Sequence, residues 1–206
     1  MYFQQKKLRY EKYHVKVLKS VLKNDKIRTR NVHVHEMSGA LQKGRIAMLY
    51  IGIDLGTSAV KLLLMDGAGQ IKKIVSKEYP IYFPHPGWSE QKPEDWFTGT
   101  MDGLKELLDG CAKDQVAGIS FGGQMHGLVI LDQNDQVIRP ALLWNDGRTW
   151  EECDYLNNVI GKEKLSEYTA NISFTGFTAP KILWIKNKEP EHFARIAKIM
   201  LPKDYI

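Results

Sequence analysis

Three short segments of the sequence combine glycine with residue types that could bind phosphate or a polyol. The first, residues 51–58, reads Ile-Gly-Ile-Asp-Leu-Gly-Thr-Ser. Gly56, Thr57 and Ser58 offer backbone N–H groups and two hydroxyls, which are donors that phosphate oxygens accept. Asp54 places a carboxylate before them, where it can organise a hydrated Mg²⁺ ion, because Mg²⁺ usually binds through one or two carboxylates plus substrate phosphates. This segment predicts a phosphate-binding turn with a metal beside it.

The pattern around this first segment separates it from other phosphate-binding motifs. A Walker loop needs Gly-x-x-x-x-Gly-Lys-Ser/Thr opening a helix, and a dinucleotide fingerprint needs Gly-x-Gly-x-x-Gly. Here an apolar stretch follows the turn, so the turn joins two strands. Lys61 adds a positive charge in the second strand, and alternation along a strand leaves the direction of its side chain open. A plain glycine turn with a capping aspartate is the competing interpretation.

The second segment, residues 122–127, reads Gly-Gly-Gln-Met-His-Gly. Glycine lets the backbone bend and approach a ligand closely, while Gln124 and His126 offer side-chain hydrogen bonds. Polyols need such groups, so the segment predicts a sugar-binding loop. A single histidine beside an apolar strand is more often structural, and the prediction therefore depends on the first segment being present as well.

The third segment, residues 143–148, reads Leu-Trp-Asn-Asp-Gly-Arg. Trp144 offers an aromatic face for the apolar side of a sugar, and Asn145, Asp146 and Arg148 present polar edges. The alternative places Trp144 in the core, Asp146 at a helix cap and Arg148 in a surface ion pair.

The elements that would position these segments follow a mixed α/β pattern. Apolar strands over 49–53 and 59–65 enclose the first turn as a hairpin, and a turn at 66–69 leads to a third strand over 71–79. The sheet is therefore predicted to open as an antiparallel meander. Strands over 116–121 and 128–131 flank the second segment.

Three helices are predicted around these strands. The first begins at Pro93, and its apolar residues recur at helical spacing: Trp96, Phe97, Met101, Leu104, Leu107 and Leu108. The others cover 148–160 and 180–188, with Thr178 as N-cap of the latter. A last strand is expected over 196–201.

Composition excludes several classes of protein. With 43% hydrophobic and 26% charged residues, the chain has the balance of a soluble globular protein. No apolar run approaches the roughly 18 residues that cross a bilayer, and no secretory signal opens the sequence, so we expect a cytoplasmic protein without a membrane partner. Cys111 and Cys153 lack a metal-ligand spacing, which predicts free thiols.

Positive charge is concentrated before the first strand. Residues 1–47 contain 12 Lys and Arg against 3 acids, whereas residues 48–206 contain 17 against 21. One interpretation is a basic amphipathic helix whose apolar residues are Leu8, Val15, Leu18 and Leu22. No repeated aromatic or Arg pattern supports nucleic-acid binding. We favour a start-site artefact with Met48 as the true start, or a disordered extension, and expect no nucleic-acid partner.

In this order the three segments resemble the FGGY carbohydrate kinases. Gly-Gln-Met-His-Gly followed by Leu-Trp-Asn-Asp-Gly-Arg looks like the xylulokinases of that family, and the similarity covers residues 48–206. Glycerol kinases of the same superfamily typically carry Arg-Glu where this chain has Met125 and His126. This difference favours a ketopentose over glycerol.

The resemblance implies the N-terminal, sugar-binding lobe of a two-lobed kinase: an α/β, ribonuclease H-like, actin-like ATPase lobe whose mixed sheet is flanked by helices. It implies phosphoryl transfer from MgATP to O5 of D-xylulose. Asp54 would organise the metal and phosphates, with Gly56, Thr57, Ser58 and Lys61 on the nucleotide. The sugar ligands would be Gln124, Met125, His126, Trp144, Asn145 and Asp146.

In the family the proton acceptor and the adenosine pocket come from further along the chain and from a second lobe. We therefore expect residues 48–206 to be a truncated lobe that has little activity alone, in a family that is often dimeric. Two alternatives stay open, a kinase for another sugar or polyol and an actin-like nucleotide-binding scaffold without a sugar.

Overall fold

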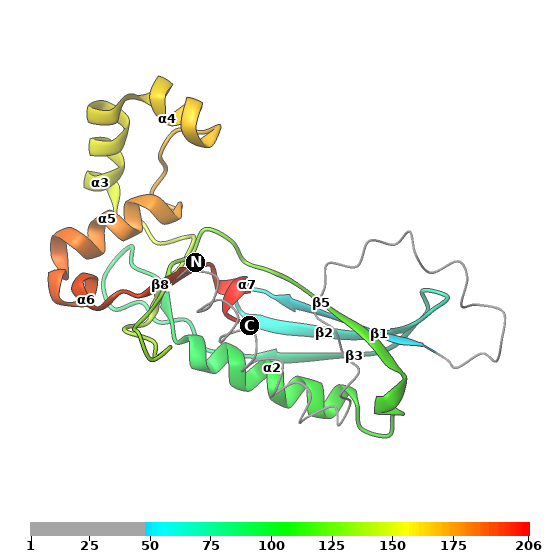
Figure 1. Ribbon diagram of the computed structural model, residues 1–206. Coiled ribbons are helices and arrows are strands. Elements are labelled where there is room, and N and C mark those ends of the chain that lie inside the picture. Colours follow the sequence, from blue (N-terminus) through cyan, green and yellow to red (C-terminus); the bar gives the residue numbers. More distant parts are fainter. Residues whose placement is uncertain (1–47) are drawn as a thin grey trace. The chain divides into compact units, whose positions relative to one another are not determined.

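The computed structural model describes residues 48–206 (Figure 1). The predictions of a basic extension, of an amphipathic helix within it and of a start at Met48 all concern residues 1–47, which lie outside this part. The chain forms two compact units, each described here by itself. The sheet unit contains residues 48–54, 60–77 and 100–122, and the loop-and-helix unit contains residues 55–59, 78–99 and 123–206.

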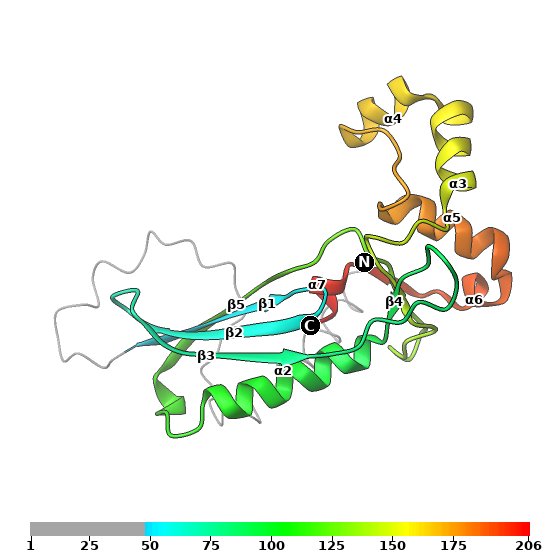
Figure 2. The same cartoon turned by 180° about the vertical axis from the view of Figure 1, so that it is seen from behind.

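The sheet unit is built on four strands: β1 (Leu49–Leu55), β2 (Ala59–Asp66), β3 (Ile71–Glu78) and β5 (Val116–Gly123). They lie in the order β3-β2-β1-β5, so the first three form the predicted meander and β5 lies beside β1 (Figure 2). Along β1 and β2, buried and more exposed residues largely alternate, because successive side chains point to opposite faces of a sheet.

The first predicted helix is α2 (Pro93–Leu107), whose residues from 100 onward belong to the sheet unit. Figures 1 and 2 show it running along the sheet. Leu104 is fully buried. A Cβ atom on Gly103 would lie 2.4 Å from Cδ1 of Leu62 in β2, so the absence of a side chain lets the helix approach the sheet. A short 3₁₀ helix, η2 (Lys113–Gln115), precedes β5.

Two small antiparallel ladders support the loops of the loop-and-helix unit. β4 (Glu90–Gln91) pairs with β7 (Ala141–Leu142), and β6 (Val129–Leu131) pairs with β8 (Lys198–Met200). β6 and β8 fall within the predicted strands. β4 and β7 contain two residues each, which is too short for an alternation pattern to reveal.

The helices of this unit are α3 (Trp150–Tyr155), the π-helix η3 (Leu156–Gly161), α4 (Lys162–Thr169), α5 (Thr178–Lys188), α6 (Pro190–Arg195) and α7 (Pro202–Tyr205). The helix predicted over 148–160 is present from Trp150 onward, and only its uniform α geometry was wrong, since its second half is a π-helix. Side-chain bonds accompany this change: the Asn157 amide donates to the carbonyl oxygen of Ser173 at 3.0 Å and accepts from its N–H at 2.9 Å.

The predicted cap of α5 was also wrong. The helix already begins at Thr178, and its N-cap residue, Phe177, provides no side-chain hydrogen bond. The Thr178 hydroxyl instead donates to the carbonyl oxygen of His126 at 3.1 Å. A hydroxyl that could have capped its own helix therefore binds the loop of residues 122–127.

The loop-and-helix unit contains an apolar cluster. Its buried members are Leu128, Ile130, Leu142, Trp184 and Ile185. Trp88 packs edge-on against Trp184 of this cluster with 5.5 Å between ring centroids, so it holds its loop against the core. Within residues 48–206 no helix is both long and apolar enough to cross a membrane.

Candidate functional site

The turn between β1 and β2 is closed by a hydrogen bond from the N–H of Gly56 to the carbonyl oxygen of Ala59, at 3.0 Å. A Cβ atom on Gly56 would lie 2.8 Å from that same oxygen. Because real Cβ atoms do not approach a backbone oxygen so closely, this position requires glycine. The predicted phosphate-binding turn is thus a tight hairpin turn, and its residues 55–59 belong to the loop-and-helix unit.

Two carbonyl groups of this turn accept hydrogen bonds from side chains of the loop-and-helix unit. The Tyr79 hydroxyl donates to the oxygen of Gly56 at 2.5 Å, and the Gln91 amide donates to the oxygen of Thr57 at 2.7 Å. In a planar trans peptide the C=O and the following N–H point in opposite directions. The N–H groups of Thr57 and Ser58 therefore point away from these two side chains, and no acceptor for them occurs among residues 48–206.

The hydroxyl of Thr57 is held by a second predicted segment. The indole N–H of Trp144 donates to Oγ1 of Thr57 at 3.0 Å. Trp144 remains 49% exposed, so the alternative that placed it in the core was wrong. The predicted aromatic platform and the predicted phosphate turn are in direct contact.

The loop of residues 122–127 also contacts this turn. The backbone N–H of Gln124 donates to the carbonyl oxygen of Leu55 at 2.7 Å. The preceding Gly123 has a φ of 151°, and a Cβ atom there would lie 2.6 Å from Cβ of Leu55. Only glycine allows the two backbones to lie this close.

Gln91 joins these parts, and the sequence did not single it out as functional. Its side chain is 1% exposed. Besides binding Thr57, its Nε2 donates to the oxygen of Pro80 at 3.1 Å. Its Oε1 accepts from Nε1 of Trp96 at 3.1 Å and from Nε2 of Gln124 at 3.2 Å. The amide thus connects four segments of the loop-and-helix unit.

The predicted sugar ligands of the second segment differ in their surroundings. Gln124 is 9% exposed and its amide nitrogen binds Gln91, so this side chain belongs partly to the framework. Met125 is 53% exposed. His126 is exposed, has a φ of 66°, and stacks on Phe177 with 4.5 Å between ring centroids. Met125 and His126 are therefore the two side chains of this loop that solvent or a ligand can reach.

Asp146 lies in a buried ion network. Its Oδ2 accepts from the N–H of Ser89 at 2.7 Å, and Arg148 donates to both carboxylate oxygens at 2.7 to 3.1 Å. Arg148 also pairs with Glu90 at 2.7 Å, and its guanidinium lies 3.7 Å from the ring centroid of Trp88. The alternatives that made Asp146 a helix cap and Arg148 a surface residue were wrong. A contact between Asp146 and a sugar stays a prediction.

Lys181 supports the loop that meets both Trp144 and His126. Its ammonium group donates to the carbonyl oxygens of residues 175–177, at 2.5 to 3.2 Å. Within that loop, a Cβ atom on Gly176 would lie 2.6 Å from the oxygen of Trp144. Burial lowers the pKa of Lys181 to about 8, because a desolvated ammonium ion is less stable.

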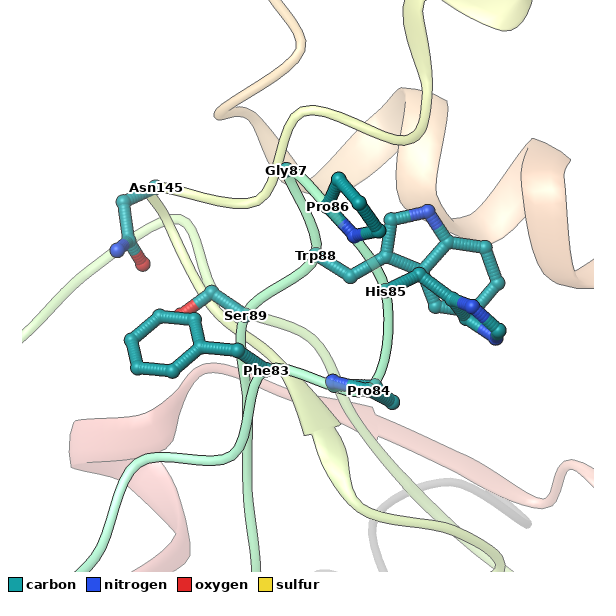
Figure 3. Close-up of a pocket in the computed structure, with 8 residues that line it drawn as sticks. All are labelled: Phe83, Pro84, His85, Pro86, Gly87, Trp88, Ser89 and Asn145. Atoms are coloured by element: carbon teal, nitrogen blue, oxygen red, sulfur yellow. The ribbon is translucent and has the colours of Figure 1, made fainter.

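Asn145 lines an open pocket with a volume of about 490 Å³, formed otherwise by residues 83–89 (Figure 3). Trp144, Met125 and His126 do not line this pocket. Figure 3 shows the Asn145 amide on the side where Phe83 and Ser89 lie. The third segment is therefore divided, with Trp144 at the turn, Asn145 at the pocket and Asp146 in the ion network.

Asp54 and Lys61 both belong to the sheet unit and have exposed side chains. Asp54 lies three residues before Thr57 in sequence, and its carboxylate has no hydrogen-bond or ion-pair partner within residues 48–206. No three His, Cys, Asp or Glu side chains gather into a metal site in this part of the chain. A metal that takes one carboxylate and completes its shell with water and phosphate oxygens fits a lone carboxylate of this kind.

Comparison with known proteins identifies the family. Residues 49–206 match the N-terminal domain of the FGGY family of carbohydrate kinases. The xylulose kinase of Bacillus subtilis is 49% identical over 159 residues, which are 76% of this chain and 32% of that protein. The chain spans about a third of the length of the curated relatives it matches.

Solved structures agree. A xyloylose kinase from Brucella ovis has a TM-score of 0.72 at 43% identity, over 76% of this chain and 33% of that one. A gluconate kinase from Lactobacillus acidophilus has a TM-score of 0.73 at 28% identity, over 77% and 32%. These likenesses confirm the predicted α/β kinase fold, and with the match over residues 49–206 they show that the chain belongs to the FGGY family of carbohydrate kinases.

Proposed function

We propose that this chain binds the phosphates and the sugar in a cytoplasmic kinase that transfers the γ-phosphoryl group of MgATP to O5 of D-xylulose. The observation that carries the proposal is the direct hydrogen bond between the loop of residues 122–127 and the turn of residues 55–59. Phosphoryl transfer depends mainly on positioning and charge neutralisation. A framework that fixes a phosphate-binding turn and a sugar-binding loop against each other supplies the positioning.

The phosphate part of the proposal is supported by the donors of the turn. The N–H groups of Thr57 and Ser58 point away from the side chains that bind their neighbouring carbonyls. With the two hydroxyls they form a set of donors of the kind that phosphate oxygens accept. Asp54 would hold Mg²⁺, which neutralises phosphate charge during the transfer, and Lys61 would add positive charge.

The sugar part is supported by the exposed residues of the second and third segments. Met125 and His126 are exposed in a loop with a left-handed residue, and Trp144 offers part of its ring to solvent. Aromatic faces suit the apolar side of a sugar, while His126 and Asn145 supply hydrogen bonds to hydroxyls. A carboxylate must accept the proton of the attacking hydroxyl, and we assign no such residue within residues 48–206.

Calorimetric titration of the 206-residue chain with D-xylulose, glycerol and D-gluconate tests this proposal. We expect D-xylulose to bind, the other two to bind at least tenfold more weakly, and His126→Ala to weaken D-xylulose binding. Tyr168→Ala, an exposed aromatic residue on α4, is the matched control and should change nothing. Preference for glycerol or gluconate would overturn the choice of sugar, and the absence of any sugar binding would favour a nucleotide-binding scaffold.

Catalysis is tested in a chimaera in which residues 49–206 replace the matching third of the B. subtilis xylulose kinase. We expect ATP-dependent formation of xylulose 5-phosphate by the chimaera and little or none by the 206-residue chain alone. Asp54→Asn in the chimaera should lower the rate and raise the Mg²⁺ concentration required. Unchanged Mg²⁺ dependence would contradict the role proposed for Asp54.

A further inference from the structure

The hydrogen bond between Trp144 and Thr57 has only one possible direction. An indole N–H is a donor and has no acceptor site, so Oγ1 of Thr57 accepts at the observed 3.0 Å. The Thr57 hydroxyl carries a single hydrogen, and this hydrogen must point elsewhere. Within residues 48–206 no acceptor for it is found, since the hydroxyl makes no second hydrogen bond there.

The backbone of Thr57 is held independently of its side chain. Gln91 binds the carbonyl oxygen at 2.7 Å from a fully buried position, which fixes the peptide plane. Threonine is β-branched and prefers few χ1 rotamers. With the peptide fixed by Gln91 and Oγ1 fixed by Trp144, the free hydroxyl hydrogen has little remaining choice of direction.

We propose that Trp144 is a positioning residue for phosphate binding, because its indole N–H orients the Thr57 hydroxyl to donate to a phosphate oxygen. A hydroxyl that already accepts a hydrogen bond is polarised and becomes a better donor. The inference rests on the proposed phosphate-binding function of the turn. It gives Trp144 a second role beside that of a sugar platform, so one side chain would serve both substrates.

A purely structural role for this hydrogen bond makes a different prediction. If the bond only stabilised the loop, removing it would lower the melting temperature without a specific effect on phosphate. If Trp144 acts through Thr57, its removal weakens phosphate binding only while position 57 carries a hydroxyl. The two possibilities are separated by a double-mutant cycle.

The experiment titrates the ¹⁵N-labelled 206-residue chain with magnesium pyrophosphate and follows the amide resonances of Thr57 and Ser58. Trp144→Phe keeps an aromatic ring and removes the donor, and we expect it to weaken pyrophosphate binding about three- to tenfold, the range of one hydrogen bond. Thr57→Val should weaken binding as much, and the double variant no more than Thr57→Val alone. In a Thr57→Ser background, Trp144→Phe should again weaken binding.

Trp150→Phe, which alters an exposed indole at the start of α3, is the matched control and should leave pyrophosphate binding unchanged. Amide spectra and melting temperatures verify that every variant is folded. Additive effects of Trp144→Phe and Thr57→Val, or no effect of Trp144→Phe, would overturn the inference while leaving the turn a phosphate site. Failure of pyrophosphate to shift Thr57 and Ser58 in the unaltered chain would overturn the proposed phosphate site itself.

Discussion

The N–H of Gln124 donates to the carbonyl oxygen of Leu55 at 2.7 Å. Gln124 lies in the loop that we propose for the sugar, and Leu55 begins the turn that we propose for phosphate. Both atoms of this hydrogen bond belong to the backbone, so no side-chain rotation can change its length. The separation of these two segments is therefore fixed to a few tenths of an ångström. A kinase needs such a fixed separation between its two substrates, because misplacement by about 1 Å can lower the rate about a hundredfold.

This contact predicts a large difference between two neighbouring glycines. Gly123→Ala would place a Cβ atom 2.6 Å from Cβ of Leu55 and 2.7 Å from its oxygen, in a backbone with φ of 151°, whereas a Cβ on Gly122 meets nothing within 4 Å. We expect Gly123→Ala to lower the free energy of unfolding by about 2 kcal/mol or more. Gly122→Ala should change it by less than about 0.5 kcal/mol.

Urea denaturation and D-xylulose titration of both variants provide the measurement. Equal stability of the two variants would show that the turn and the loop can separate without cost.

Gln91 provides a second prediction. In Gln91→Leu the new side chain has a size similar to that of glutamine but forms no hydrogen bonds. The oxygen of Thr57, the indole N–H of Trp96 and the amide of Gln124 therefore lose their partner. Each buried unsatisfied group costs about 1–3 kcal/mol, so we expect a loss of at least about 2 kcal/mol in unfolding free energy. Gln133→Leu, at an exposed position, is the control and should be nearly neutral. A Gln91→Leu variant as stable as the control would contradict the role of Gln91.

Local patterns were enough to predict the hairpin, the meander and the glycine-lined loop. At Gly56 and Gly123 a neighbouring backbone lies too close for a side chain. Such a close approach requires glycine, and a glycine can be recognised in the sequence. The alternation of buried and more exposed residues along β1 and β2 likewise follows from the order of residues in each strand, because successive side chains point to opposite faces of the sheet. These features depend on residues that are close along the chain or on a single missing side chain.

Features that depend on distant partners could not be predicted. Nothing in residues 86–91 indicated that Gln91 would bind Thr57, because the two residues are 34 positions apart. Asp146 was predicted as a sugar ligand from its place in the third segment and from the family resemblance, and its burial with Arg148 follows from tertiary packing. The π-helix η3 is accompanied by the bonds of Asn157 to Ser173, which a helical periodicity does not reveal.

The buried ion pair of Arg148 is expected to matter more for stability than a surface pair. Arg148→Lys keeps the charge but loses the forked contact with Asp146 and the stacking on Trp88. Because Lys cannot reproduce a bidentate, stacked guanidinium, we expect a loss of about 2–4 kcal/mol in unfolding free energy. The control is Lys188→Ala, which removes an exposed pair with Glu151 and should cost less than about 1 kcal/mol. Equal losses in guanidinium denaturation would contradict this ranking.

From the burial of Lys181 we predict that the free energy of unfolding changes with pH in the alkaline range. Burial lowers its pKa from the usual 10.5 to about 8 in the folded chain. Between pH 8 and pH 10.5 the unfolded chain therefore binds a proton that the folded chain has released, and stability rises with pH wherever the unfolded state binds more protons. Below pH 8 both states are protonated and the cost of burying the charge is constant.

The test compares the unaltered chain with Lys181→Gln, which keeps a hydrogen-bond donor and lacks the titrating amine. Other groups that titrate in this window are common to both proteins, so the difference in their unfolding free energies isolates Lys181. We expect this difference to shift by roughly 3 kcal/mol in favour of the unaltered chain between pH 8 and pH 10.5. Lys186→Met, an exposed lysine on the same helix, should show no such shift. A flat difference for Lys181→Gln, or an NMR titration that places the amine pKa near 10.5, would show that the three carbonyl bonds outweigh the cost of burial.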